Sequence, residues 1–593
     1  MLLSRLTPSR RFTLLAASLL LATGGVASVS AQQAAPAFTQ IIVFGDSLSD
    51  TGNIRARTNS KSGGTVDYPS HTFNYSDGRF TNSSTTNPSS TAFVGVWHEQ
   101  LARTFLNLQE ARFSLGGGTD YAFGGATTKN GTIDRVVVTA PLFGDLTITI
   151  DNMGKQVDDY LAARVVDPNA LYISWGGGND LFDDDSSTSV TATAARATAL
   201  VSRLANAGAK YIMVPNVPPL GAIPKYAKDA AKMASLNAAS AKYRDELSSD
   251  LTASLSSLAA QGITPKVYQL DVWTNTIRLF ANPAKYGFTN TKDSAQGQSS
   301  VNPNQYLFWD DIHPTTAGHY QTAKGANDAL TLPPPAPAKA VNLATRVDVE
   351  TGERVSIAGF IVTGDVSKKV LIRGIGPSLT ANGITNPLAD PTLTLFDAAG
   401  NPMQSNDNWQ DTQQAEIMAT GIPPKDRLES AIVATLAPGL HSASFAGKSG
   451  GTGVGVVEVY DLEASSSSTL ANVSTRGFVG SGDNAMIAGV ILGSGDSPIV
   501  VLRVIGPTLT SSGIVGPLLD PTIQLFDGNG TVIGFNDNWK DTQPQAVRAT
   551  NLAPLDDRES AIVAFLPPGN YSAVVRGKGD TTGVAVVEAY RLP

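Results

Sequence analysis

Cysteine is absent from all 593 residues of the sequence. Its absence excludes disulfide bonds, thiolate metal sites, a cysteine nucleophile and lipidation of an N-terminal cysteine. Basic residues are outnumbered, with 43 Lys and Arg against 51 Asp and Glu and a formal net charge of −8. An acidic surface matches a phosphate backbone poorly, so the sequence disfavours nucleic acid as a partner. Only five histidines are present, which leaves few candidates for a general base.

The sequence also lacks an apolar run long enough to span a bilayer. Near its start, Arg5, Arg10 and Arg11 precede the short apolar stretch 12–22, and small residues follow up to Ala31. This stretch is too short for a membrane span and is typical of a cleavable signal peptide, although a retained membrane anchor is the alternative. We therefore predict a signal peptide over residues 1–31. The mature protein is expected in an extracellular, cell-surface or periplasmic location, without a transmembrane segment.

Two stretches of biased composition divide the remaining chain. Residues 332–340 are rich in proline, which favours an extended, semi-rigid spacer. Residues 464–469 are rich in serine and have the composition of a flexible linker. The length of the chain allows several domains, so we predict three, over residues 36–331, 341–463 and 470–593.

The two C-terminal regions resemble each other closely. The segment 406–409, Asn-Asp-Asn-Trp, recurs as 536–539, and between Arg373 and Asp397 16 of 25 positions match the residues that lie 130 further on. We interpret this as a tandem duplication. Short apolar or β-branched runs, bounded by Gly, Pro, Asp or Asn, predict an all-β, sandwich-like fold for each copy.

The recurring Asn-Asp-Asn-Trp segment has two interpretations. Its oxygens suit calcium and an exposed indole suits a sugar, so the repeats are candidates for contact with a polysaccharide or a cell surface. The alternative is an Asx-rich turn with a packed tryptophan, in repeats that only space or stabilise the protein. The residues concerned are Asp407, Trp409 and Asp411 in the first copy and Asp537, Trp539 and Asp541 in the second.

The region 36–331 alternates apolar strands with helices. Its fully apolar strands are typical of a parallel sheet covered on both faces, which predicts a three-layer α/β/α, doubly wound (flavodoxin-like) fold. Such sheets bind ligands beyond the carboxyl ends of their strands. The expected strands lie at 41–44, 171–175, 211–214 and 266–270, and the longest expected helices at 190–207 and 226–260.

Two motifs in this region carry candidate chemistry. Ser47 directly follows the first strand, where a tight turn exposes a hydroxyl near backbone N–H groups, as a nucleophile requires. Alternatively, it only caps a helix. Near the end of the region, Asp310 and His313 are three residues apart in an expected loop, so the carboxylate can orient the imidazole as a base. His319 is a second candidate base, and a plain His-Pro loop is the other alternative.

Two glycine-rich turns complete the set. Asn179 lies in 176–180, directly after another apolar strand, and its amide is suited to donate to an oxyanion. Gly125 lies in 123–127, where glycine allows the backbone to approach a ligand closely. Each of these turns by itself is an ordinary turn.

Together these motifs resemble the conserved blocks of the GDSL family, also called SGNH hydrolases, in the family's order and over residues 38–325. The extended first motif, Phe44 to Asn53, is similar to the secreted lipase branch. The sequence departs from the family at Asp120, where asparagine is usual, which puts the packing of that turn in doubt. The matching blocks are 45–48, 124–126, 177–180 and 310–315.

The resemblance implies a role for each of five residues. Ser47 would be the nucleophile, His313 the general base and Asp310 its orienting carboxylate. The backbone N–H groups of Ser47 and Gly125 and the side chain of Asn179 would form the oxyanion hole. The implied chemistry is two-step acyl transfer, which requires no metal and no organic cofactor.

We therefore expect an exported esterase or lipase that hydrolyses carboxylic esters of lipids or small molecules. Two alternatives remain open. One is a carbohydrate O-acetylesterase whose β-repeats bind sugar, and the other is a surface adhesion protein in which the GDSL-like region is only a scaffold.

Overall fold

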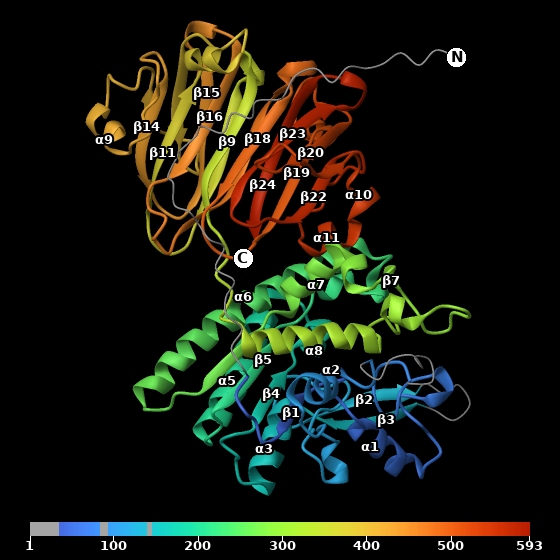
Figure 1. Ribbon diagram of the computed structural model, residues 1–593. Coiled ribbons are helices and arrows are strands. Elements are labelled where there is room, and N and C mark those ends of the chain that lie inside the picture. Colours follow the sequence, from blue (N-terminus) through green and yellow to red (C-terminus); the bar gives the residue numbers. More distant parts are fainter. Residues whose placement is uncertain (1–34, 84–92, 139–144, 593) are drawn as a thin grey trace, which may run out of the picture. The chain divides into compact units, whose positions relative to one another are not determined.

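The computed structural model describes residues 35–83, 93–138 and 145–592 (Figure 1). The chain divides at Pro334 and Pro335 into two compact units, each of which is described by itself. The expected signal peptide, residues 1–31, lies outside the described residues. Among the residues described, no helix is both long and apolar enough to cross a membrane.

The N-terminal unit is built on a parallel sheet of four strands in the order β1-β4-β5-β6. Every residue of β1 (Ile41–Gly45) and β4 (Leu171–Trp175) is buried, as is all of β5 (Tyr211–Pro215) except its first residue. Only β6 (Lys266–Leu270), at the edge, alternates. These four strands confirm the prediction, and the burial of β1, β4 and β5 shows that both faces of the sheet are covered there.

Helices cover the two faces. Ile42 and Phe44 pack with α3 (Met153–Ala163), α5 (Ser187–Asn206) and α6 (Ala230–Ala260) on one face. Alternate residues of the same strand pack on the other face with α2 and α8, so the predicted three-layer α/β/α fold is confirmed. The bounds of the other principal elements are α1 (Asn53–Ser62), α2 (Trp97–Gln100), β2 (Thr132–Val138), β3 (Leu146–Asp151), α4 (Gly178–Asp183), α7 (Val272–Ala281), β7 (Asn290–Ser294), β8 (Tyr306–Phe308) and α8 (Thr316–Thr331).

Caps explain where two helices differ from their expected starts. Helix α5 begins three residues earlier than expected, because the side chain of Ser186 accepts a hydrogen bond from the Ser189 amide. Helix α6 begins four residues later than expected, because Asp229 accepts from the amide of Lys232 and caps the helix there. The residues before it form a separate short turn, Pro224–Tyr226.

The C-terminal unit consists mainly of β-strands, and its first eight strands follow the same order as its last eight. Its sequence also forms the short helices α9 (Gln414–Ala419), α10 (Trp539–Thr542) and α11 (Pro544–Ala549). The first eight are β9 (Ala340–Val349), β10 (Ser356–Thr363), β11 (Lys368–Ile375), β12 (Pro391–Phe396), β13 (Pro402–Asn406), β14 (Ser430–Leu436), β15 (Gly439–Gly447) and β16 (Gly453–Asp461). The last eight are β17 (Thr469–Val479), β18 (Met486–Leu492), β19 (Ile499–Ile505), β20 (Pro521–Phe526), β21 (Val532–Asn536), β22 (Ser560–Phe565), β23 (Gly569–Gly577) and β24 (Gly583–Leu592).

The two halves of this unit exchange their first strands. Strand β9 pairs with β16 of its own half and with β18 of the other, whereas β17 pairs with β24 of its own half and with β10 of the other. Thr345 and Thr475, which are 130 residues apart, share a buried hydroxyl–hydroxyl hydrogen bond of 2.7 Å where β9 and β17 meet. The halves therefore share one hydrophobic core.

The serine-rich stretch between the halves is held by a buried lysine. The ammonium of Lys368 donates to the carbonyl oxygens of Glu463 (3.0 Å) and Ser468 (2.8 Å), and it forms an ion pair with Asp461 at 2.8 Å. Both charged side chains of the pair are fully buried. The carbonyl groups at the two ends of this stretch thus satisfy a charge that would otherwise be costly to bury.

The tryptophans of the recurring segment are packed. Trp409 and Trp539 are 6% and 5% exposed, which contradicts the exposed indole of the sugar-binding interpretation. Lysine ammonium groups neutralise the neighbouring aspartates, with Lys448–Asp407 at 2.5 Å and the second-half equivalent of this pair at 2.6 Å. In the described parts of the chain, no three metal-ligating side chains of the His, Cys, Asp or Glu type gather closely enough to hold an ion.

Candidate active site

Ser47 lies in a tight turn at the carboxyl end of β1. The carbonyl of Asp46 accepts the amide of Ser49 at 3.0 Å, and the carboxylate of Asp46 accepts the amide of Leu48 at 3.0 Å. A side chain at Gly45 would lie 2.8 Å from the carbonyl oxygen of Trp175, so only glycine fits there. Helix α1 starts later, with Gly52 as its N-cap, so Ser47 does not cap it.

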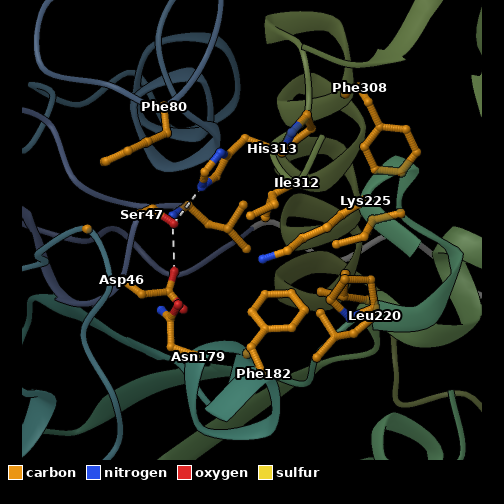
Figure 2. A pocket seen from close by; sticks show the side chains of 18 of the residues that line it. Asp46, Ser47, Phe80, Asn179, Phe182, Leu220, Lys225, Phe308, Ile312 and His313 are labelled. Atoms are coloured by element: carbon orange, nitrogen blue, oxygen red, sulfur yellow. Dashed lines mark hydrogen bonds between the residues drawn. The ribbon is translucent and has the colours of Figure 1, made fainter. Parts of the chain in front are cut away.

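The loop between β8 and α8 brings a base and a carboxylate to this serine. Nε2 of His313 lies 2.8 Å from Oγ of Ser47, and Nδ1 of His313 lies 2.8 Å from Oδ2 of Asp310. Figure 2 shows Ser47 and His313 facing each other at the cavity. The other oxygen of Asp310 accepts the amides of Ile312 and His313, each at 2.7 Å. The turn therefore holds carboxylate, imidazole and hydroxyl in line.

The environment keeps Asp310 ionised. Burial alone would raise its pKa, but the charge and hydrogen bonds of His313, together with a hydrogen bond from Tyr75, outweigh burial and hold the pKa at about 2. An ionised carboxylate is what stabilises an imidazolium that forms during proton transfer.

Three donors line the same cavity as Ser47 and His313. Asn179 donates one amide hydrogen to the carbonyl of Ala126 at 3.0 Å, which fixes the side chain and leaves its second N–H available. Gly125 has φ of +83°, a conformation that favours glycine. In the described chain, the amides of Ser47 and Gly125 donate to no protein acceptor. The structure thus brings Ser47, His313, Gly125 and Asn179 to one cavity, with Asp310 bonded to the imidazole of His313.

His319, the other candidate base, does not reach the serine. It is 1% exposed, and burial, reinforced by the charges of His313 and His98, lowers its pKa to about 3. Its prediction as an alternative base is wrong, because His313 alone of the two contacts Ser47.

Asp120, where the family usually has asparagine, is fully buried beneath the turn. One of its oxygens accepts the amide (2.9 Å) and the hydroxyl (2.5 Å) of Thr51, and the other accepts the amide of Ala122 at 2.9 Å. Burial and the neighbouring carboxylate of Asp50 raise the pKa of Asp120 well above its ordinary value. This aspartate therefore connects the strand end to the segment that follows Ser47.

Three further residues support the site. The hydroxyl of Tyr75 donates to Oδ2 of Asp310 at 2.7 Å, and the ring of Phe80 lies 4.8 Å from the ring of His313. Gln156 of α3 bonds both the amide and the carbonyl of Gly45, at 2.8 and 2.9 Å. Tyr75 lies in an irregular segment without periodicity, so no pattern could single it out.

The cavity beside Ser47 has a volume of about 460 Å³. Its size falls within the range of small-molecule and cofactor sites. It is lined mainly by apolar side chains, several of which are labelled in Figure 2 beside the charged Lys225. The apolar residues include Leu220, Ile223, Leu279, Phe280, Phe308 and Ile312.

A hydroxyl, an imidazole and a carboxylate in line, at the carboxyl edge of a doubly wound sheet, is the arrangement that α/β serine hydrolases use. Residues 41–326 match the model of the GDSL-like lipase/acylhydrolase family. This part of the chain is accordingly a GDSL lipase/acylhydrolase domain.

Relatives with assigned names agree with this domain. The chain is 26% identical over 381 residues to lipase 1 of Photorhabdus luminescens, an alignment that covers 52% of each protein. It is 25% identical over 342 residues to a phosphatidylcholine-sterol acyltransferase of Aeromonas hydrophila, covering 49% of this chain and 90% of that one. The chain thus spans about half the length of lipase 1.

Among solved structures, a member of the lipolytic G-D-S-L family from Veillonella parvula matches with 16% identity and a TM-score of 0.24. The match covers 48% of this chain and 95% of that structure.

Proposed function

We propose that the N-terminal unit hydrolyses carboxylic esters through an acyl-enzyme on Ser47. The observation that carries the proposal is the unbroken chain from Ser47 through His313 to Asp310, with 2.8 Å at each contact. Two backbone amides and the Asn179 side chain line the same cavity and are available to an oxyanion.

These groups can carry out two half-reactions, acylation and then deacylation of Ser47. Oγ of Ser47 attacks the ester carbonyl as its proton passes to Nε2 of His313, and Asp310 stabilises the imidazolium. The carbonyl oxygen becomes an oxyanion that accepts from the amides of Ser47 and Gly125 and from Asn179. The alcohol leaves with the proton from His313. Water then attacks the acyl-enzyme, with His313 again as base, and releases the acid and free Ser47.

The preferred substrates are esters with an extended acyl chain, as in lipids. A cavity of about 460 Å³ that is lined mainly by apolar side chains favours burial of a hydrocarbon chain over an acetyl group. The competing function, removal of acetyl groups from polysaccharides by an enzyme with sugar-binding repeats, loses support because both tryptophans of the recurring segment are packed.

The proposal extends to export and to the origin of the β unit. Three arginines, a short apolar stretch and small residues before Ala31 support a cleaved signal peptide. The 130-residue offset in sequence and the repeated strand order support a tandem duplication. N-terminal sequencing of the exported protein should begin at Gln32, and a mature chain that retains Met1 would contradict cleavage.

The test is hydrolysis of 4-nitrophenyl esters of graded acyl length. Ser47→Ala should lower kcat by roughly 10⁴-fold or more, as expected for loss of a nucleophile. Ser49→Ala is the matched control, because its hydroxyl accepts from the Trp97 indole at 3.1 Å and not from His313. This control should stay within about threefold of wild type, in line with the small effect of one neutral hydrogen bond away from the reacting atoms.

The length profile separates the candidate functions. Each buried methylene contributes about 0.8 kcal/mol, so kcat/KM should rise about fourfold for each CH₂ added to the acyl chain until the cavity is filled. A profile that peaks at acetyl would favour the O-acetylesterase. A folded wild type without Ser47-dependent turnover at any length would favour the adhesion protein.

A further inference from the structure

The segment between α1 and residue 83 places a tyrosine against the candidate catalytic carboxylate. The hydroxyl of Tyr75 donates to Oδ2 of Asp310 at 2.7 Å, and the same oxygen receives Nδ1 of His313 at 2.8 Å. Tyr75 and Asp310 are 235 residues apart in sequence. The phenol and the imidazole thus share one carboxylate oxygen.

Tyr75 differs from the other hydrogen-bond donors to Asp310 in its place in the fold. A carboxylate offers about four lone-pair sites, and in the described structure Asp310 fills them with two amides, the imidazole and the phenol. Three of these donors come from the loop of Asp310 itself, through Ile312 and His313. Among the described residues, Tyr75 is therefore the one donor that ties the carboxylate to another part of the fold.

Aromatic contacts hold the tyrosine in place. Its ring lies edge-on to Trp309, at a centroid distance of 6.3 Å and an angle of 86°, and edge-on to Phe80 at 6.5 Å and 73°. Phe80 in turn covers the imidazole of His313. The hydroxyl of Thr81 donates to the carbonyl of Pro314 at 3.0 Å, so the segment contacts the catalytic loop at several points.

A group of charged residues anchors the other side of this segment. Arg55 of α1 pairs with Asp67 at 2.7 Å and with Asp77 at 3.0 Å. The imidazole of His71 lies between the same two aspartates, 2.6 Å from each. Tyr75 lies between these anchored positions, so its hydroxyl approaches Asp310 from a braced segment rather than from a free loop.

We propose that Tyr75 is a positioning residue of the hydrolytic machinery, which acts through Asp310 on His313. This inference rests on the proposed function of Ser47 and His313. The phenol restrains rotation of the carboxylate and takes up part of its charge. Without the phenol, the carboxylate attracts the proton of the imidazolium more strongly and is less well fixed.

The kinetic test compares Tyr75→Phe with Tyr68→Phe. Tyr68 lies in the same segment and lines the cavity, but its hydroxyl makes no hydrogen bond to a described residue. For Tyr75→Phe we expect kcat to fall about tenfold, as for loss of a hydrogen bond to a charged group, with KM unchanged. The acid limb of its pH–rate profile should move to higher pH. Tyr68→Phe should leave that limb in place.

The charged surroundings of the imidazole are the same in both variants. His313 faces Asp310 directly, and the nearby titratable groups are Asp46, on the turn of Ser47, and His319, on α8. Tyr68 lies near Asp310 as well, and burial followed by that charge raises its pKa to about 12. A shift confined to Tyr75→Phe is therefore assigned to the lost hydrogen bond.

A double-mutant cycle tests whether Tyr75 acts through Asp310. In an Asp310→Asn background, Tyr75→Phe should cause little further loss of kcat. An equal tenfold loss in both backgrounds, or an unchanged pH profile and kcat in the single variant, would overturn the proposal.

A spectroscopic readout separates this inference from the proposed function. The Nδ1 proton shared by His313 and Asp310 gives a downfield ¹H NMR signal, which should shift in Tyr75→Phe and not in Tyr68→Phe. A shifted signal without ester turnover would keep the positioning role and reject the proposed function. An unshifted signal in a protein that hydrolyses esters would reject the positioning role alone.

Discussion

The turn of Ser47 and a repeated arginine–glutamate pair of the C-terminal unit hold buried carboxylates in different ways. Around Ser47, the buried Asp46 and Asp50 form no ion pair with a described residue, and burial raises the pKa of each to about 6 despite backbone hydrogen bonds. In the C-terminal unit, Glu458 is paired with Arg373, and an equivalent pair recurs 130 residues later. The turn beside the cavity thus keeps buried carboxylates without a described cation, whereas the repeated position in the β unit keeps its carboxylate paired with arginine. The first arrangement leaves polar groups available to a reacting ester, whereas the second contributes to the stability of the fold.

The largest expected effect tests the scaffold side of this comparison. Arg373→Met leaves Glu458 buried without its cation and removes donors from Tyr460 and from the carbonyl of Ile422. We expect the free energy of unfolding to fall by about 3–5 kcal/mol, measured by urea denaturation of the full chain. Arg354→Met is the control, because its pair with Glu350 is exposed and should contribute under about 1 kcal/mol. If both variants lost the same free energy of unfolding, the buried pair would contribute no more to stability than the exposed pair.

The next largest effect tests the hydrogen-bond donors that line the cavity beside Ser47. Asn179→Ala should lower kcat by roughly 10²–10³-fold, because its second N–H is available to a reacting oxyanion. Loss of its bond to the Ala126 carbonyl should lower the free energy of unfolding by only about 1 kcal/mol. Asn275→Ala, which lines the same cavity but is not one of the proposed donors, is the matched control for kinetics with a nitrophenyl ester. A similar loss of kcat in both variants would argue against a specific oxyanion donor.

The smallest effect tests the unpaired carboxylates through pH. Because the pKa of Asp46 is raised from 3.8 to about 6, the folded state binds this proton more tightly than the unfolded chain. That stabilisation is complete below the unfolded pKa and is lost as the pH rises through about 6. Asp46→Asn keeps an acceptor for Leu48 and should raise the free energy of unfolding at pH 8 by up to about 3 kcal/mol over wild type, with a smaller gain at pH 5.

Thermal unfolding at the two pH values measures this difference. The exposed Asp159, which pairs with Lys155 four residues before it, provides the control variant Asp159→Asn. If Asp46→Asn gave the same gain at pH 5 and pH 8, the pKa of this aspartate would not be raised by folding.

Local sequence was sufficient for the parts of the fold that depend on local patterns. The strands of the N-terminal sheet were predictable because each is a short apolar run that both faces of a parallel sheet require. Ser47 and His313 were predictable because each lies in a short motif that resembles a family block. Their 2.8 Å contact joins positions 266 residues apart, so only the family resemblance, and not the spacing, indicated that they meet.

Other features depend on pairings that no local pattern specifies. Tyr75 contacts Asp310 from an irregular segment, and no local pattern indicates which carboxylate a phenol will meet. The exchange of β9 and β17 was hidden for another reason. The two strands are 130 residues apart in similar copies, so the apolar alternation of each fits either half equally well. The packed Trp409 was one of two open interpretations, because its sequence surroundings suit a turn with the ring either buried or exposed.

The strand exchange has a mechanical consequence. A pull transmitted through the proline-rich stretch enters the C-terminal unit at the start of β9, which is hydrogen-bonded along both of its edges to β16 and β18. Force along the strand would have to shear both ladders together instead of peeling one edge strand bond by bond. The first strand after the linker is therefore expected to resist tension better than a strand paired along one edge.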